Sequence, residues 1–186
     1  MIQFTPCAKV ALALARREAD RVGHDHVGTV HLLLGLIEFG NGDVIRALQQ
    51  MGIDRQVLRN AVTAVMPKRG NRKGIIRLEF TNSVEGRVEL QAAGGIPYTP
   101  RVKKVLARAD KLAGDLNHLE VGSLHLFLGL LAEGESCTAQ AFRNIGVDAE
   151  LTCREVWHMI EPDSPFPGQM ELRWGLHVPV KSECCQ

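Results

Sequence analysis

The sequence predicts an all-α fold made of two copies of a four-helix repeat. The stretch Val27–Leu36, VGTVHLLLGL, returns 94 residues later as Val121–Leu130, VGSLHLFLGL. Phe4–Pro6 and Tyr98–Pro100 share the same offset. Such self-similarity at one fixed offset is the signature of an internal duplication. Aromatic residues make up only 5% of the chain, so the core must consist mainly of aliphatic side chains, which suits packed helices. We therefore expect two pseudo-twofold-related repeats that pack on each other.

The first repeat is predicted to span residues 1–66. Its first helix should run from Cys7 to about Val22, after a Thr5-Pro6 start that suits a helix cap and first turn. The second helix should run from Val30 to about Phe39, with Thr29 as its N-cap. Because this helix is apolar almost all round, we expect it to be buried. The apolar residues assigned to the inner face of the first helix are Val10, Ala11, Leu14, Ala15 and Ala19.

Two shorter helices complete this repeat. Asp43 is the expected cap of the third helix, which Gly52 closes. Asp54 is the expected cap of the fourth helix, which ends at Pro67. The inner face of the fourth helix is predicted to hold Val57, Leu58, Ala61, Val62 and Val65.

The second repeat is predicted to span residues 98–161 and to follow the same plan. Its helices are expected at Pro100–Leu116, Leu124–Glu133, Cys137–Asn144 and Ala149–Ile160, with Thr99, Ser123 and Asp148 as caps.

Residues 67–97 form a linker with a different pattern. Apolar and charged residues alternate over residues 76–80 and again over 87–90, with a turn-like stretch between them. This alternation predicts a β-hairpin. An isolated hairpin is unstable in water, so it should lie against the helices or pair with another chain. The remaining residues, 162–186, are expected to form an extended or poorly ordered, proline-containing tail, whose Cys-Cys-Gln ending suggests a natural stop.

Charge and composition exclude several classes of protein. The formal net charge is +1, which provides no general attraction to nucleic acid or to an anionic membrane. The five cysteines contain no CxxC pair, which indicates a reducing compartment rather than a disulfide scaffold. The sequence has no secretory signal and no apolar stretch near 18 residues. We therefore expect a cytoplasmic protein with no membrane association.

The repeated motifs resemble the amino-terminal repeat domain of the Clp chaperone ATPases, most of all the ClpC type. The resemblance rests on the [FY]TP opening, the VG[TS]xHLxLGL helix and the MGID and IGVD links to the last helix of each repeat. It covers about two thirds of the chain and implies an all-α, pseudo-twofold domain that docks adaptor proteins and substrates. The ATPase modules are not part of this sequence, which has no GxxxxGK[ST] phosphate loop, so we expect no unfolding activity from it alone.

The resemblance also implies where partners bind. ClpC-type domains usually carry VGTEHLLLGL, and the glutamate is linked to recognition of phosphorylated arginine. Val30 and Leu124 occupy those positions here. An apolar side chain cannot replace a carboxylate that pairs with a guanidinium, so we do not expect phosphoarginine binding in either repeat. Thr5 and Thr99 remain at helix starts, where free N–H groups can meet an anion. The predicted partner-binding residues are Thr5 with Val30, and Thr99 with Leu124.

Other chemistry is weakly indicated. Histidines gather around the repeated motif, but the interpretation we prefer is that His31 and His125 bond to backbone within the core. Glu155-x-x-His158 has a di-iron spacing that occurs only once, and such sites need two, so we expect no metal and no cofactor. Cys7 has no partner base, and no catalytic triad pattern appears, so we expect no enzyme activity.

The preferred function is that of a non-enzymatic interaction module that binds a Clp-type ATPase, its adaptor or unfolded protein substrates in protein quality control and proteolysis. One alternative is a regulatory or structural protein that forms a homodimer through the hairpin. A weaker alternative is a nucleic-acid binder that uses the basic stretch Lys68–Arg77, although this stretch holds no aromatic residue for stacking.

Overall fold

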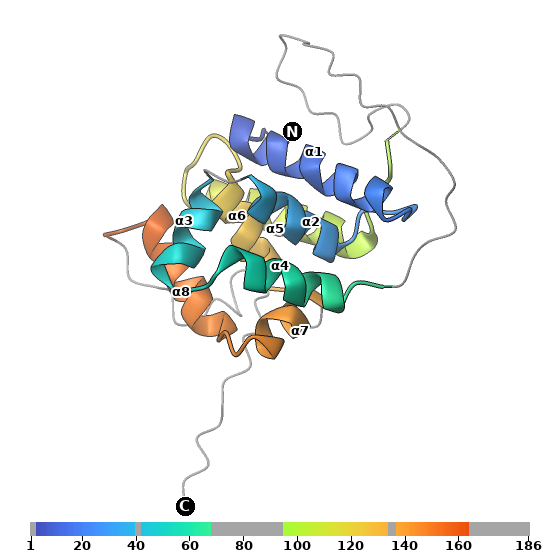
Figure 1. Cartoon of the computed structure of the whole chain (residues 1–186). Coiled ribbons are helices and arrows are strands. Elements are labelled where there is room, and N and C mark those ends of the chain that lie inside the picture. Colours follow the sequence, from blue (N-terminus) through green and yellow to red (C-terminus); the bar gives the residue numbers. More distant parts are fainter. Residues whose placement is uncertain (1–2, 40–41, 68–94, 134–136, 164–186) are drawn as a thin grey trace, which may run out of the picture.

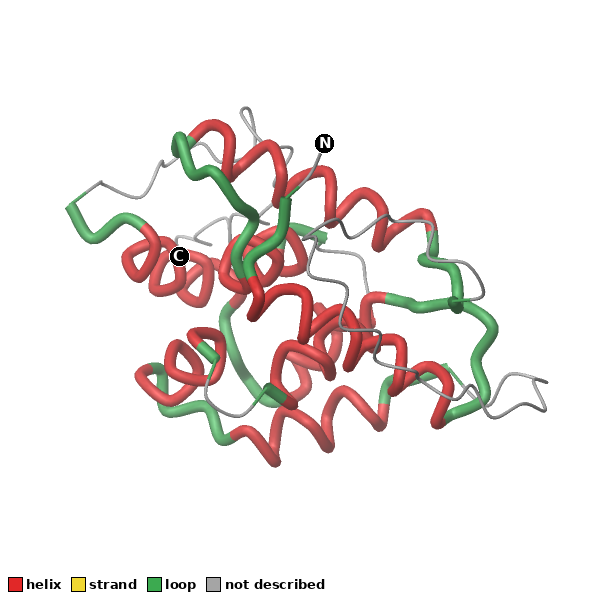
Figure 2. Tube along the Cα trace, turned by 90° about the horizontal axis from the view of Figure 1, so that it is seen from above, coloured by secondary structure: helices red, strands yellow, loops and turns green. Residues whose placement is uncertain are grey.

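The computed structural model describes residues 3–39, 42–67, 95–133 and 137–163, and this part consists of helices joined by loops (Figures 1 and 2). The helices are α1 (Pro6–Arg21), α2 (Thr29–Glu38), α3 (Asp43–Gln50), α4 (Arg55–Ala64), α5 (Pro100–Asp115), α6 (Ser123–Leu131), α7 (Cys137–Asn144) and α8 (Ala149–Ile160). The predicted all-α class is confirmed for the described residues. The predicted hairpin, the basic stretch Lys68–Arg77 and nearly all of the 162–186 tail lie outside the described residues, so they stay predictions.

Side-chain caps start four of the helices, as the sequence predicted. Thr5 Oγ1 accepts from the backbone N–H of Ala8 at 3.2 Å, and Thr99 Oγ1 accepts from that of Val102 at 3.3 Å. Asp54 and Asp148 each accept two N–H groups at the starts of α4 and α8. These bonds satisfy donors that the first helical turn would otherwise leave without partners.

The predicted caps of α2, α3 and α6 were wrong. Thr29, Asp43 and Ser123 are the first helical residues, and glycines 28, 42 and 122 precede them in extended conformation. In α2 and α6 the third helical residue, a histidine, bonds to the residue before the helix. His31 Nδ1 accepts from the backbone N–H of Gly28, and His125 Nδ1 accepts from that of Gly122, both at 2.9 Å. This is the returning half of a capping box, with histidine in the place of the usual Glu or Gln.

The core forms around α2 and α6, whose side chains are buried on nearly every face, as predicted. Helix α1 packs against α2 (Figure 1), and their backbones approach each other closely at Gly35. A Cβ built on Gly35 would overlap the carbonyl oxygen of Ala11 and lie 2.7 Å from the nitrogen of Ala15. Only glycine allows this approach.

Two inner-face assignments need correction. Val57 in α4 is 51% exposed and Val10 in α1 is 41% exposed. In α4 the buried stripe is centred on Leu58 and Val62, and Val57 lies about 100° away from Leu58 around the helix. Leu151, the counterpart of Val57 in the second repeat, is 57% exposed for the same reason.

Two short backbone bridges join the repeats, and each repeat contributes its opening segment to the other. Thr5 N–H donates to the carbonyl of Val121 at 3.1 Å, and Val121 N–H donates to that of Gln3 at 2.7 Å. Val27 N–H donates to the carbonyl of Pro97 at 2.8 Å, and Thr99 N–H donates to that of Val27 at 3.0 Å. We call these two contacts, Phe4↔Val121 and Val27↔Tyr98, the inter-repeat joints.

The turn after α5 offers a test of backbone conformation. Asn117 has a φ of 57°, while its counterpart after α1, Gly23, has a φ of 72°. Because glycine adopts this region without a Cβ penalty, we expect Asn117→Gly to raise the free energy of unfolding by about 0.5–1 kcal/mol. Urea denaturation followed by circular dichroism measures the change. A loss of stability would show that the Asn117 side chain contributes more than its backbone strain costs.

Candidate functional site

The four predicted partner-binding residues lie at the starts of four helices. Thr5 and Thr99 are the N-caps of α1 and α5, while Val30 and Leu124 are the second residues of α2 and α6. The structure groups them differently from the predicted pairs. Thr5 and Val30 lie toward opposite ends of α1, because α1 spans 16 residues and the residue after Val30, His31, contacts His24 just beyond its far end. A helix of this length is about 24 Å long.

The inter-repeat joints set the actual grouping. Thr5 bonds to Val121, on the loop that leads into Leu124, and Thr99 bonds to Val27, on the loop that leads into Val30. A Cβ built on Gly122 would lie 4.0 Å from Cγ2 of Thr5, which confirms how near Thr5 is to the start of α6. We define cluster A as Thr5 with Leu124, and cluster B as Thr99 with Val30. Each cluster therefore contains one residue from each repeat.

The two clusters expose apolar surface to different extents. Val30 is only 4% exposed, whereas Leu124 is half-buried, as are both threonines. Neither apolar residue offers a polar atom to a ligand. At these positions a partner would meet aliphatic surface beside a capped helix start.

A contact that the sequence analysis missed distinguishes cluster B. The Arg16 guanidinium lies over the Tyr98 ring, 4.8 Å from its centroid, in a cation–π contact. Tyr98 is 6% exposed, and burial raises the pKa of its hydroxyl. In cluster A, Phe4 and Asp110 occupy the corresponding positions, so this contact is absent there. The [FY]TP motif could have revealed the Phe-to-Tyr difference, but no local pattern brings Arg16 to Tyr98.

The histidines form two matching pairs. His24 Nδ1 lies 2.8 Å from His31 Nε2, and His118 Nδ1 lies 3.0 Å from His125 Nε2. The ring planes meet at 71° and 72°. The predicted backbone bonds of His31 and His125 are confirmed, but His24 and His118 are more than loop residues. The repeated seven-residue spacing, H-x6-H, was the signal available in the sequence.

We call His31 and His125 the inner rings of the two pairs, and His24 and His118 the outer rings. Burial has the largest effect on the pKa of the inner rings. It lowers the pKa of His31 to about 4, with the neighbouring His24 adding to the effect and Glu18 opposing it. Burial also lowers the pKa of His125 to about 4, helped by His118. Both inner histidines are therefore neutral at pH 7.

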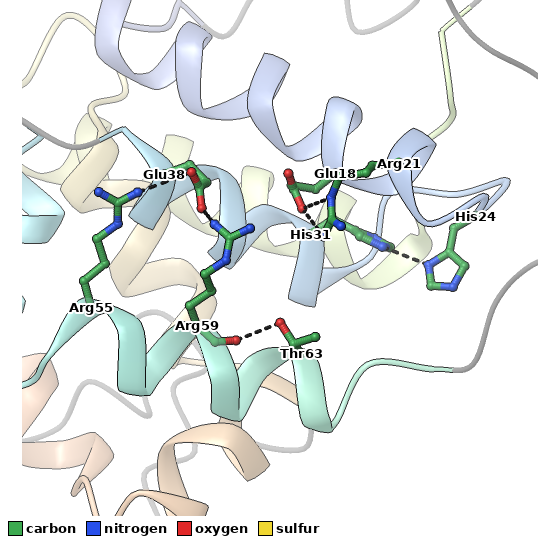
Figure 3. Close-up of polar contacts among 8 residues, drawn as sticks. All are labelled: Glu18, Arg21, His24, His31, Glu38, Arg55, Arg59 and Thr63. Atoms are coloured by element: carbon green, nitrogen blue, oxygen red, sulfur yellow. Dashed lines mark hydrogen bonds and ion pairs between the residues drawn. The ribbon is translucent and has the colours of Figure 1, made fainter.

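Ion pairs hold the surrounding helices without forming a reactive group. Glu38 of α2 pairs with Arg55 and Arg59 of α4, and buried Glu18 pairs with Arg21 at 2.8 Å (Figure 3). Burial raises the pKa of the Cys153 thiol to about 12, so it is inert as a nucleophile. Within the described ranges, no three His, Cys, Asp or Glu residues gather as a metal site. None of the helices described is long and apolar enough to cross a membrane.

Comparisons with known proteins agree with the arrangement of repeats. The profile of the Clp repeat (R) N-terminal domain matches residues 3–92 and 97–170. The chain is 33% identical over 167 residues to the chaperone protein ClpB of Oceanobacillus iheyensis, which covers 90% of this chain and 18% of the relative. It is 36% identical over 158 residues to the chloroplastic chaperone protein ClpC of Pisum sativum, covering 85% of this chain and 15% of the relative.

A solved structure supports the same fold. The N-terminal domain of the chaperone ClpD from Arabidopsis thaliana superposes with a TM-score of 0.63 at 21% identity, covering 86% of this chain and 95% of that one. The chain spans less than a fifth of the length of the two curated relatives named above, and this part is the amino-terminal domain rather than the ATPase modules. Both repeats match the family profile, so the chain belongs to the family of Clp repeat N-terminal domains.

Proposed function

We propose that this chain is a non-enzymatic protein-interaction module, which binds a Clp-type ATPase, its adaptor or unfolded protein substrates, in the cytoplasm. The observation that carries the proposal is that both repeats match the Clp repeat profile. Relatives that are named as chaperones, and one that is named as an ATP-binding subunit of an ATP-dependent Clp protease, supply the context of protein quality control and proteolysis. This chain contributes recognition, and any unfolding work belongs to an ATPase.

We assign recognition to clusters A and B. The two lie at the inter-repeat joints, where each helix start is held by backbone bonds from the other repeat. Binding surfaces on rigid elements need little reordering when a partner docks, which lowers the entropic cost of association. Leu124 supplies the more accessible aliphatic contact, because it is half-buried while Val30 is 4% exposed. We therefore expect cluster A to contribute more apolar contact than cluster B.

Binding to an unfolded client tests the function. The full chain is immobilised and titrated with reduced, carboxymethylated α-lactalbumin and, separately, with a purified Clp-type ATPase. We expect saturable binding to at least one of them, and we expect Leu124→Ser to weaken it by about tenfold, since it removes a buried aliphatic contact. Leu119→Ser is the matched control, because Leu119 is 94% exposed and belongs to neither cluster. Absence of binding to both proteins, or equal effects of the two variants, would contradict the proposal.

A phosphoarginine peptide tests the specificity of the clusters. We expect no binding at micromolar concentration by isothermal titration calorimetry, because Val30 and Leu124 provide no carboxylate for the guanidinium. The variants Val30→Glu and Leu124→Glu restore that charge, and Leu124→Glu should acquire measurable affinity first because its position is more accessible. Micromolar binding by the unaltered chain that is lost in Thr5→Val or Thr99→Val would overturn the assignment.

A further inference from the structure

The two histidine pairs have a fixed direction of hydrogen bonding. Gly28 N–H donates to His31 Nδ1, so the proton of the neutral His31 ring resides on Nε2. That Nε2–H donates to His24 Nδ1 at 2.8 Å, which leaves the proton of His24 on its own Nε2. The second repeat repeats this order from Gly122 through His125 to His118. The backbone donor at one end thus determines the tautomer of both rings.

In this arrangement neither ring can take a second proton without losing a hydrogen bond. A second proton on His31 must bind Nδ1, where it would face the N–H of Gly28. A second proton on His24 must bind Nδ1, where it would face the Nε2–H of His31. In either case two donors oppose each other and one hydrogen bond is lost. The same holds for His125 and His118.

The outer ring of each pair lies on the loop that forms an inter-repeat joint. His24 precedes Val27, which exchanges hydrogen bonds with Pro97 and Thr99. His118 precedes Val121, which exchanges them with Gln3 and Thr5. The inner rings lie on α2 and α6, so each pair ties its loop to a core helix. Figure 3 shows the pair of the first repeat. Loss of a pair removes the side-chain anchor of the loop that joins the repeats.

The charged neighbours differ between the repeats. The carboxylate that acts on His31 is Glu18 of α1, which is 3% exposed and pairs with Arg21. Leu112 occupies the equivalent position in the second repeat, and there Glu161, after α8, lies 3.3 Å from His118 Nε2. Glu18 therefore acts on the inner ring of the first pair, whereas Glu161 contacts the outer ring of the second pair.

We propose that the two histidine pairs form an acid-sensitive latch, which keeps both inter-repeat joints closed while the rings are neutral and releases them when a ring gains a proton. The consequence is a local opening at Thr5 and Thr99, the capping residues of clusters A and B, before the helical core unfolds. Protonation is the only chemical change, and it breaks and forms no covalent bond between heavy atoms.

Hydrogen exchange of the full chain, measured by NMR at pH 7.5 and pH 4.5, tests the latch. The reporters are the amides of Gly28, Gly122, Val27 and Val121, and the core reference is Leu33. After correction for intrinsic exchange rates, we expect the opening constants of the reporters to rise about 50-fold on acidification, because the pKa of His31 and of His125 is about 4 in the closed state and returns to the ordinary histidine value near 6.5 on opening. At pH 4.5 the opening constant of Leu33 should remain at least about tenfold below those of the reporters, because the core opens only on global unfolding.

The control variant is the double substitution His31→Gln and His125→Gln. Glutamine at the third helical position is the ordinary capping-box residue, so it can accept from the same glycine N–H but does not titrate. In this variant we expect the opening constants of the reporter amides to change by less than about threefold between the two pH values. An equal response in the variant and the unaltered chain, or reporters that open only together with Leu33, would overturn the latch.

A measurement on the unaltered chain keeps the proposal testable if the double variant does not fold. Nitrogen-15 NMR of the imidazoles should show His31 and His125 as Nε2–H tautomers at pH 7.5, with the protonated form appearing as the reporter amides open. The Nδ1–H tautomer at either residue, or protonation with the joints still closed, would show that these pairs do not act as a latch.

Discussion

Gly35→Ala is expected to lower the free energy of unfolding by about 3 kcal/mol or more, through overpacking of backbone against backbone. The new methyl group would overlap the carbonyl oxygen of Ala11 and lie 2.7 Å from the nitrogen of Ala15. Neither atom can rotate away as a side chain could, so α1 must shift from α2. The greater helix propensity of alanine returns only about 1 kcal/mol. Urea denaturation followed by circular dichroism measures the loss.

Two other glycines supply matched controls. Gly129 is the counterpart of Gly35 in α6, and its added Cβ would lie 2.9 Å from the carbonyl oxygen of Val105 but 3.5 Å from the nitrogen of Ala109. We expect Gly129→Ala to cost about 1–2 kcal/mol. Gly114 in α5 has open space around it, so Gly114→Ala should stabilise the chain by up to about 1 kcal/mol. Equal losses at Gly35 and Gly129 would contradict the close approach of α1 and α2.

Acidification from pH 7 to pH 4 is expected to lower the free energy of global unfolding by up to about 5 kcal/mol through His31 and His125. The pKa of each ring is lowered to about 4 in the folded chain, whereas an unfolded histidine titrates near 6.5. Between these values the unfolded state binds more protons. The stabilisation is therefore fully present above pH 6.5 and is lost as the pH falls toward 4. The rings are 2% and 6% exposed, so solvent screens them little.

Urea midpoints at pH 7 and pH 4.5 check the acid effect, with His31→Gln and His125→Gln as separate variants. Each variant should remove about half of the difference between the two pH values, because the two rings titrate alike. Carboxylates that do not interact with either ring act equally in all three proteins and cancel in the comparison, whereas Glu18 acts on His31 and is part of its effect. If the single variants keep the full pH dependence, the inner histidines do not cause it.

Local sequence patterns were sufficient for most of the fold. The repeat offset and helical periodicity located every described helix to within about two residues, the usual precision at helix ends. The caps of α2, α3 and α6 were misassigned for a physical reason. Thr29, Asp43 and Ser123 are good capping residues by type, but cap position depends on backbone geometry, and in α2 and α6 a histidine two residues later takes that role.

The candidate site could be predicted only residue by residue. Motif comparison selected Thr5, Val30, Thr99 and Leu124 as candidates, yet it grouped them within each repeat. The joints connect each opening segment to the other repeat, and such a crossing depends on contacts between residues far apart in the chain. The same limit applies to Arg16 and Tyr98. Periodicity reports which face of a helix is buried but not which distant segment covers it.

Because the inter-repeat joints connect each opening segment to the other repeat, one repeat alone could not form them. A chain with one repeat would leave the backbone groups of both its opening segment and its loop without partners, since in this protein each is satisfied by the other half. Two identical single-repeat chains would satisfy each other by reciprocal exchange of their opening segments, as in a domain-swapped dimer with a true twofold axis. Fusion of two such genes would keep every exchanged bond while freeing each copy to diverge, as Phe4 and Tyr98 have done.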